Sequence, residues 1–81
     1  MDDKSILERI GELVDEEHRL RGGVQSGALA SEQEQARLSY LEESLDQCWD
    51  LLRRRRAAQA SGQNPDEVGP RSVGEVEGYL Q

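Results

Sequence analysis

The sequence predicts an all-α fold, namely an antiparallel two-helix hairpin with a long second helix and a short C-terminal tail. Three observations lead to this prediction. Apolar residues spaced three and four apart form one stripe, the Leu seam: Leu38, Leu41, Leu45, Cys48 and Leu52. Such spacing is typical of one face of an α-helix. A second amphipathic segment precedes this stripe, and a glycine-rich stretch separates the two. Two copies of the hairpin are expected to pair into a four-helix bundle.

The first helix is expected over residues 5–21. Ser5 and Glu8 have the spacing of a capping box, in which two side chains satisfy free backbone N–H groups at a helix start. One face carries apolar side chains: Ile6, Ile10, Leu13 and Leu20, widened by Leu7 and Val14. Gly11 lies near the edge of this face, where close approach of another helix would explain a glycine. Gly22-Gly23 is expected to end the helix.

Residues 22–30 form the connection, and their length suits an antiparallel turn between helices. Ser31 and Glu34 form a second capping box, so the second helix is expected over residues 32–60. Pairing the two helices as a hairpin places Ile6 near Gln47. The turns from Arg53 to Ala60 then extend beyond the first helix and need support, because helix ends are not stable in isolation.

Residues 1–60 are therefore read as the hairpin, and residues 61–81 as a C-terminal loop and docking tail. Gly62 and Pro65 end the second helix and begin the loop. Val73, Val76 and Leu80 share one helical face beside Tyr79, but Gly74 and Gly78 weaken this segment as a helix. The tail is either disordered or docked, and a docked tail offers a surface to an unidentified protein partner.

Size and composition favour association of the chain with itself. A core in a chain of 81 residues is small, and such chains usually gain stability from disulfides, a metal or oligomerisation. Cys48 is the only cysteine, which excludes an internal disulfide. A homo-oligomer is therefore expected. The formal net charge of −7 opposes general binding to nucleic acid or anionic membranes.

The start of the chain is acidic and lacks an apolar run, so it is not read as a secretory signal. No stretch approaches the roughly 18 apolar residues that a membrane span requires. We therefore expect a cytoplasmic protein with a reduced thiol and no membrane association.

The expected interface combines the apolar faces of both helices. It comprises Leu38, Leu41, Leu45, Cys48, Trp49, Leu52, Ile6, Ile10 and Leu13. Trp49 anchors either this interface or the hairpin core, since buried tryptophan often dominates association energy. Cys48 is read as a small buried hydrophobe. A redox role or a disulfide-linked dimer is the alternative.

Four arginines close the second helix, and they are a candidate anion-binding site: Arg53, Arg54, Arg55 and Arg56. They complement the negative end of the helix dipole. Carboxylates at Asp2, Asp3 and in the tail are expected to pair with them, with the first two near Arg53. Guanidinium groups also suit phosphates of RNA or DNA. The nearby acids and the absence of interleaved aromatic residues favour ion pairs over nucleic acid.

Asp15, Glu17 and His18 are weak candidates for metal ligands. Asp15 and His18 have the i, i+3 spacing of the Glu-x-x-His motif of di-metal four-helix proteins. The second helix supplies only Glu34 as an inward acid, so Glu17 is instead expected to pair with Arg37 or with a partner chain. No cofactor is expected. No nucleophile–base pair, phosphate-binding glycine loop or paired carboxylates stand out, so the protein is not read as an enzyme.

Three segments resemble a family of small actinobacterial proteins catalogued as domain of unknown function 2630. They are ERIGELVDEEHRLR (8–21), YLEESLDQCWDLLRRRRA (40–57) and NPDEVGPRSVGEVEGYLQ (64–81), within which LDQCWDLLR and EVEGYLQ are most specific. The resemblance implies a cytoplasmic actinobacterial setting and supplies no activity, cofactor or catalytic residue. It adds weight to the tail as a structured element.

Three functions follow from the sequence. The first is a non-catalytic helical interaction module, acting as a homo-oligomer or as an adaptor for another protein. The second is an accessory factor that binds an RNA-containing or transcription machine through Arg53–Arg56. The third is a carboxylate–histidine metal site in a helical bundle.

Overall fold

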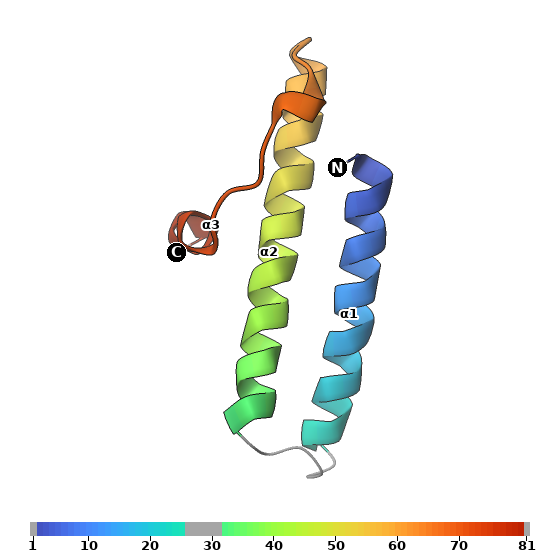
Figure 1. Ribbon diagram of the computed structural model, residues 1–81, viewed down its shortest axis with the longest axis vertical. Coiled ribbons are helices and arrows are strands. Elements are labelled where there is room, and N and C mark those ends of the chain that lie inside the picture. The colour runs from blue at the N-terminus through green and yellow to red at the C-terminus, as the bar shows by residue number, and fades with distance from the viewer. Residues whose placement is uncertain (1, 26–31, 81) are drawn as a thin grey trace.

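The computed structural model describes residues 2–25 and 32–80, which form three α-helices and one short 3-10 helix. These are α1 (Asp3–Gln25), α2 (Glu32–Ala60), η1 (Pro65–Glu67) and α3 (Val73–Leu80). The helices α1 and α2 lie side by side and antiparallel (Figure 1), and no described residue lies in a strand. The predicted all-α fold is confirmed. The pairing of two copies into a four-helix bundle stays a prediction.

Helix α1 begins earlier than predicted, because Asp2 rather than Ser5 caps it. The backbone N–H of Ser5 donates to Asp2 Oδ1 at 2.8 Å, and the N–H of Ile6 donates to the Asp2 carbonyl at 3.0 Å. The first of these bonds is the main cause that lowers the pKa of Asp2 below its usual value. A carboxylate at this position both accepts a free N–H and complements the positive end of the helix dipole. Ser5 therefore lies in the first turn.

The predictions for two glycine positions of α1 are wrong. The helix continues through Gly22-Gly23 to Gln25 instead of ending near Arg21. A glycine ends a helix when it adopts a left-handed backbone conformation, and among the described residues only Gly62 has a positive φ. Gly11 is exposed, and a Cβ added there would meet nothing within 4 Å. No close helix approach explains this glycine.

Helix α2 covers the residues that were expected, and Gly62 ends it. Gly62 has φ of 81°. Its N–H donates to the Gln59 carbonyl at 3.2 Å, and the N–H of Gln63 donates to the Ala58 carbonyl at 2.8 Å. These two bonds form a Schellman motif, which satisfies carbonyls left free at the helix end. Ser31, the predicted cap at the start of α2, lies outside the described residues, as do residues 26–30 of the connection.

The core lies between α1 and α2 and continues beneath the tail. Its buried apolar side chains are Ile6, Ile10, Leu13, Leu41, Leu51, Leu52, Ala58 and Val76. Ile6 packs in one cluster with Leu51 and Leu52, about one turn further along α2 than the predicted neighbour Gln47. This shift shortens the overhang of α2, because Arg55 and not Arg53 lies opposite the start of α1.

The end of α2 is covered by the chain's own tail. After Gly62 the chain turns back, and η1 lies beside the last turns of α2 (Figure 1). Arg55 is only 5% exposed and joins three segments there. Its guanidinium donates to Asp3 Oδ1 at 2.8 Å, to the Pro65 carbonyl at 2.9 Å and to Asp66 Oδ1 at 3.1 Å. The overhang is therefore supported within one chain.

Side chains of α2 also hold the extended segment that leads to α3. Arg54 Nη2 donates to the Gly69 carbonyl at 2.6 Å, and Gln47 Nε2 donates to the Arg71 carbonyl at 3.1 Å. Each bond satisfies a backbone carbonyl that has no helix or strand partner. The segment is thereby fixed along α2.

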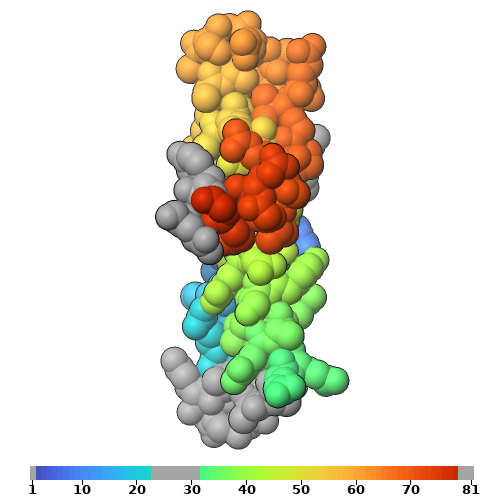
Figure 2. Space-filling model, turned by 90° about the vertical axis from the view of Figure 1, so that its left-hand side faces the viewer, coloured from blue at the N-terminus to red at the C-terminus, as the bar shows by residue number. Residues whose placement is uncertain are grey.

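Helix α3 packs on the side of α2 that faces away from α1 (Figure 1), and it lies across the middle of α2 (Figure 2). A capping box starts it. The N–H of Glu75 donates to Ser72 Oγ at 3.2 Å, and the N–H of Ser72 donates to Glu75 Oε1 at 3.4 Å. Val76 anchors the helix and is 1% exposed. The side chains of Tyr79 and Leu80 lie outside the described part of the tail.

Candidate functional site

The hairpin has two edges along which α1 and α2 meet, and an ion pair marks each edge. On one edge, Arg21 of α1 pairs with Glu42 of α2. On the other edge, Glu16 of α1 accepts from Arg37 Nε at 2.7 Å. That bond lowers the pKa of Glu16 below its usual value. Because residues seven apart share a helix face, these pairs show which other side chains lie on each edge.

An apolar strip follows the Arg21–Glu42 edge. From α1 it contains Leu7 and Val14, which lie fourteen and seven residues before Arg21. From α2 it contains Leu38, Leu45 and Trp49, which lie four residues before, three after and seven after Glu42. Leu7 is 43% exposed and Trp49 is 42% exposed. Val14 and Leu45 are half-buried and pack against the hairpin core. The apolar strip is therefore an outward continuation of the core.

The residues predicted as an interface fall into two groups. Five of them are buried within the single chain: Ile6, Ile10, Leu13, Leu41 and Leu52. Leu38, Leu45 and Cys48 are half-buried, and Trp49 is exposed. Leu7 and Val14 had been placed only at the margin of the first helix's apolar face. The heptad spacing of Leu7, Val14 and Arg21 was the signal that could have found them.

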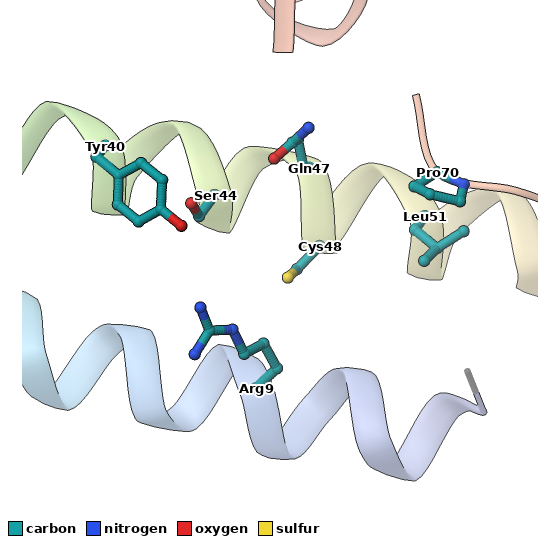
Figure 3. Close-up of a pocket in the computed structure, with 7 residues that line it drawn as sticks. All are labelled: Arg9, Tyr40, Ser44, Gln47, Cys48, Leu51 and Pro70. Atoms are coloured by element: carbon teal, nitrogen blue, oxygen red, sulfur yellow. The ribbon is translucent and has the colours of Figure 1, made fainter. Parts of the chain in front are cut away.

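A cleft of about 330 Å³ lies on the opposite edge, beside the Glu16–Arg37 pair. Its lining residues are Arg9, Tyr40, Ser44, Gln47, Cys48, Leu51 and Pro70 (Figure 3). The Cys48 thiol points toward α1, and burial raises its pKa despite the opposing charge of Arg9. A raised pKa keeps the thiol protonated, and a protonated thiol is a poor nucleophile.

The four arginines at the end of α2 have different roles. Arg54 Nε pairs with Asp50 Oδ2 at 3.0 Å, and Arg55 pairs with Asp3 and Asp66. The expected partner of Asp3 was Arg53, so that assignment is corrected by two residues along α2. Arg53 and Arg56 are exposed and make no ion pair with a described residue. Two guanidinium groups of the run thus remain exposed.

The three metal-ligand candidates do not converge. Asp15 and His18 are exposed, and Glu17 pairs with Arg21 Nε at 3.1 Å. The expected partner of Glu17 was Arg37, which pairs with Glu16 instead. Within residues 2–25 and 32–80, no three His, Cys, Asp or Glu side chains are grouped so that they could hold a metal ion.

A pair of carboxyl groups lies where α3 meets α2. The Asp46 carboxylate of α2 beside Glu77 of α3 raises the pKa of Glu77, and burial adds to the shift. The charges of Glu43 and Glu42 act in the same direction. The folded chain therefore holds a proton on Glu77 more tightly than the unfolded chain does.

Residues 2–81 match the family described as protein of unknown function (DUF2630). The chain belongs to this family. Uncharacterised proteins of Mycobacterium bovis and Mycobacterium tuberculosis are 44% identical to it over 77 residues, which cover 95% of this chain and 88% of each relative. The resemblance inferred from the three sequence segments is thus confirmed. No solved structure matches the chain.

For this DUF2630 protein, the described helices give one further result. None of them is long and apolar enough to cross a membrane. The apolar strip brings exposed large hydrophobic side chains from both long helices, Leu7 and Trp49, to one edge.

Proposed function

We propose that this DUF2630 protein is a non-catalytic helical interaction module that pairs with a second copy through the apolar strip. The exposure of Trp49 carries the proposal. This side chain is the only tryptophan of the chain, and 42% of its surface remains in contact with water. Exposed apolar surface that is continuous with a core is typical of a protein–protein contact. When two hairpins stack, the helices of one copy cover the apolar strip of the other.

The energetics suit a weak, reversible dimer. Covering the exposed part of Trp49 gains about 2.5 kcal/mol per copy, from an area near 250 Å² and about 25 cal/mol per Å². Covering the exposed part of Leu7 adds about 1 kcal/mol per copy. The total of roughly 7 kcal/mol per dimer is similar to the roughly 4–15 kcal/mol that association costs. The half-buried strip residues and the charges around them therefore supply whatever net affinity the dimer has, and we expect this affinity to be weak.

Sedimentation of the full chain over a concentration series, up to the millimolar range, tests the proposal. The mass should rise from 9.1 kDa toward twice that value. The emission of Trp49 should shift to shorter wavelength over the same range, because its indole loses contact with water. Trp49→Ser should hold the protein at the monomer mass. Tyr40→Ser is the matched control, since Tyr40 is 49% exposed but lines the cleft on the other edge.

The outcome that contradicts the proposal is a mass of 9.1 kDa and unshifted Trp49 emission at every concentration.

The alternative is an accessory factor that binds RNA or DNA through Arg53 and Arg56, the two arginines that lack an ion pair with a described residue. It predicts retention on immobilised RNA that falls steeply with salt. The double variant Arg53→Gln/Arg56→Gln would abolish that retention.

A further inference from the structure

The two ends of the apolar strip carry opposite charge. At one end, Arg21 is shared by Glu17, at 3.1 Å, and by Glu42. Two carboxylates against one guanidinium leave one excess negative charge there. Beyond Trp49 at the other end, Arg53 and Arg56 continue the same edge of α2, four and seven residues further on. Both are exposed, and neither is neutralised by a described residue.

This distribution decides between the two ways in which strips of identical chains can meet. A parallel pair would place Arg53 against the partner's Arg53 and each acidic end against its copy. An antiparallel pair would place the basic end of each strip against the acidic end of the other. Charge complementarity across an interface selects orientation and register, because apposed like charges are costly.

We infer that two copies pair antiparallel, about a two-fold axis that crosses α2 between Leu45 and Trp49. This inference rests on the proposed self-association. In such an isologous contact both copies use the same surface, so every contact between two residues occurs twice. Leu45 packs on the partner's Trp49, and Arg53 reaches the partner's Glu42. The two ion pairs and the two Leu–Trp contacts are thus symmetric.

The axis position also separates like charges. Glu42 lies five residues from the axis and Arg53 lies six residues from it on the other side. At 1.5 Å per residue, the two Glu42 side chains start roughly 15 Å apart and the two Arg53 side chains roughly 18 Å apart. Both separations exceed the Debye length of about 8 Å at physiological salt. The repulsion between copies is therefore screened, while the contact pairs are close.

Charge reversal with mixing of variants tests this register. Arg53→Glu alone should weaken the dimer about 10- to 30-fold, because two exposed ion pairs become two repulsive contacts. Glu42→Arg alone should weaken it similarly. An equimolar mixture of the two variants should recover near wild-type affinity as a heterodimer, since one contact is then the unchanged Glu42–Arg53 pair and the other is rebuilt with exchanged signs. Arg19→Glu is the control, because it changes net charge equally at an exposed position off both edges.

Salt gives a second measurement. The wild-type dimer should weaken as salt rises, because its ionic contacts are attractive, whereas a parallel pair would strengthen. Equal affinity of Arg53→Glu and wild type, or a dimer that salt strengthens, would overturn the antiparallel register. These results leave self-association standing if Trp49→Ser still abolishes the dimer. Loss of the Trp49→Ser effect would instead remove the proposed function itself.

Discussion

Val76→Ala tests whether α3 is a separate unit that one side chain fastens to α2. Val76 is 1% exposed, and α3 has eight residues and packs, among the described elements, on α2 alone. The substitution removes two carbon atoms at about 0.8 kcal/mol each, and the residual cavity raises the loss to about 2 kcal/mol. Since 1.4 kcal/mol is a factor of ten, undocked α3 should become roughly 30-fold more populated.

Amide hydrogen exchange measures this change directly. The amides of residues 73–80 should exchange roughly 30-fold faster in Val76→Ala, while those around Leu41 and Leu52 keep their protection. Local opening of this kind is expected where few buried contacts hold an element. Val73→Ala is the control, because Val73 is only half-buried and should give a smaller effect.

Two results would refute the reasoning. If the core amides lose protection together with those of α3, then docking of the tail and closure of the hairpin are one cooperative event. If the amides of α3 are unprotected already in the wild type, then burial of Val76 does not hold this helix.

Three further predictions concern single positions. Gly11→Ala should raise the free energy of unfolding by about 0.5–1 kcal/mol in urea titrations, since the site is helical and open; a loss of stability would contradict this. Glu77→Gln should slow amide exchange in α3 at pH 7. The folded-state pKa of Glu77 is raised, so the native state binds the proton more tightly and docking weakens as pH rises from the usual value of 4.5 through the folded value. Variant and wild type should converge below pH 4.5, and equal exchange at pH 7 would exclude a role for the Asp46 contact. Cys48 should react with iodoacetamide at pH 8 more slowly in the folded chain than in urea, because burial raises its pKa; equal rates would show an accessible thiolate.

The long elements were predictable because their signals are local. The Leu seam fixed the face of α2, and Gly62 fixed its end, since a left-handed residue there satisfies the last carbonyls. The same rule failed at Gly22-Gly23, where the backbone stays helical. The capping box of Ser72 and Glu75 was visible in the sequence and was missed, because the glycines of α3 made that segment look unsuited to a helix.

The candidate site was predictable only in part. Periodicity placed Trp49, Leu38 and Leu45 on an apolar face, but it cannot say which members of that face α1 covers. That depends on the axial offset of the two helices. The Asp3–Arg55 pair lies two residues further along α2 than the expected neighbour Arg53, so the offset differs from the predicted one. The backbone carbonyls that Arg54 and Gln47 bind have no sequence signature, because every residue carries a carbonyl.

Arg55 binds one carboxylate that lies 52 residues before it and another that lies 11 residues after it. Both contacts can form only when the hairpin has closed and the chain has reversed at Gly62. Interactions absent from the folding transition state act mainly on the rate of unfolding. We therefore expect that replacing Arg55 speeds unfolding more than it slows folding.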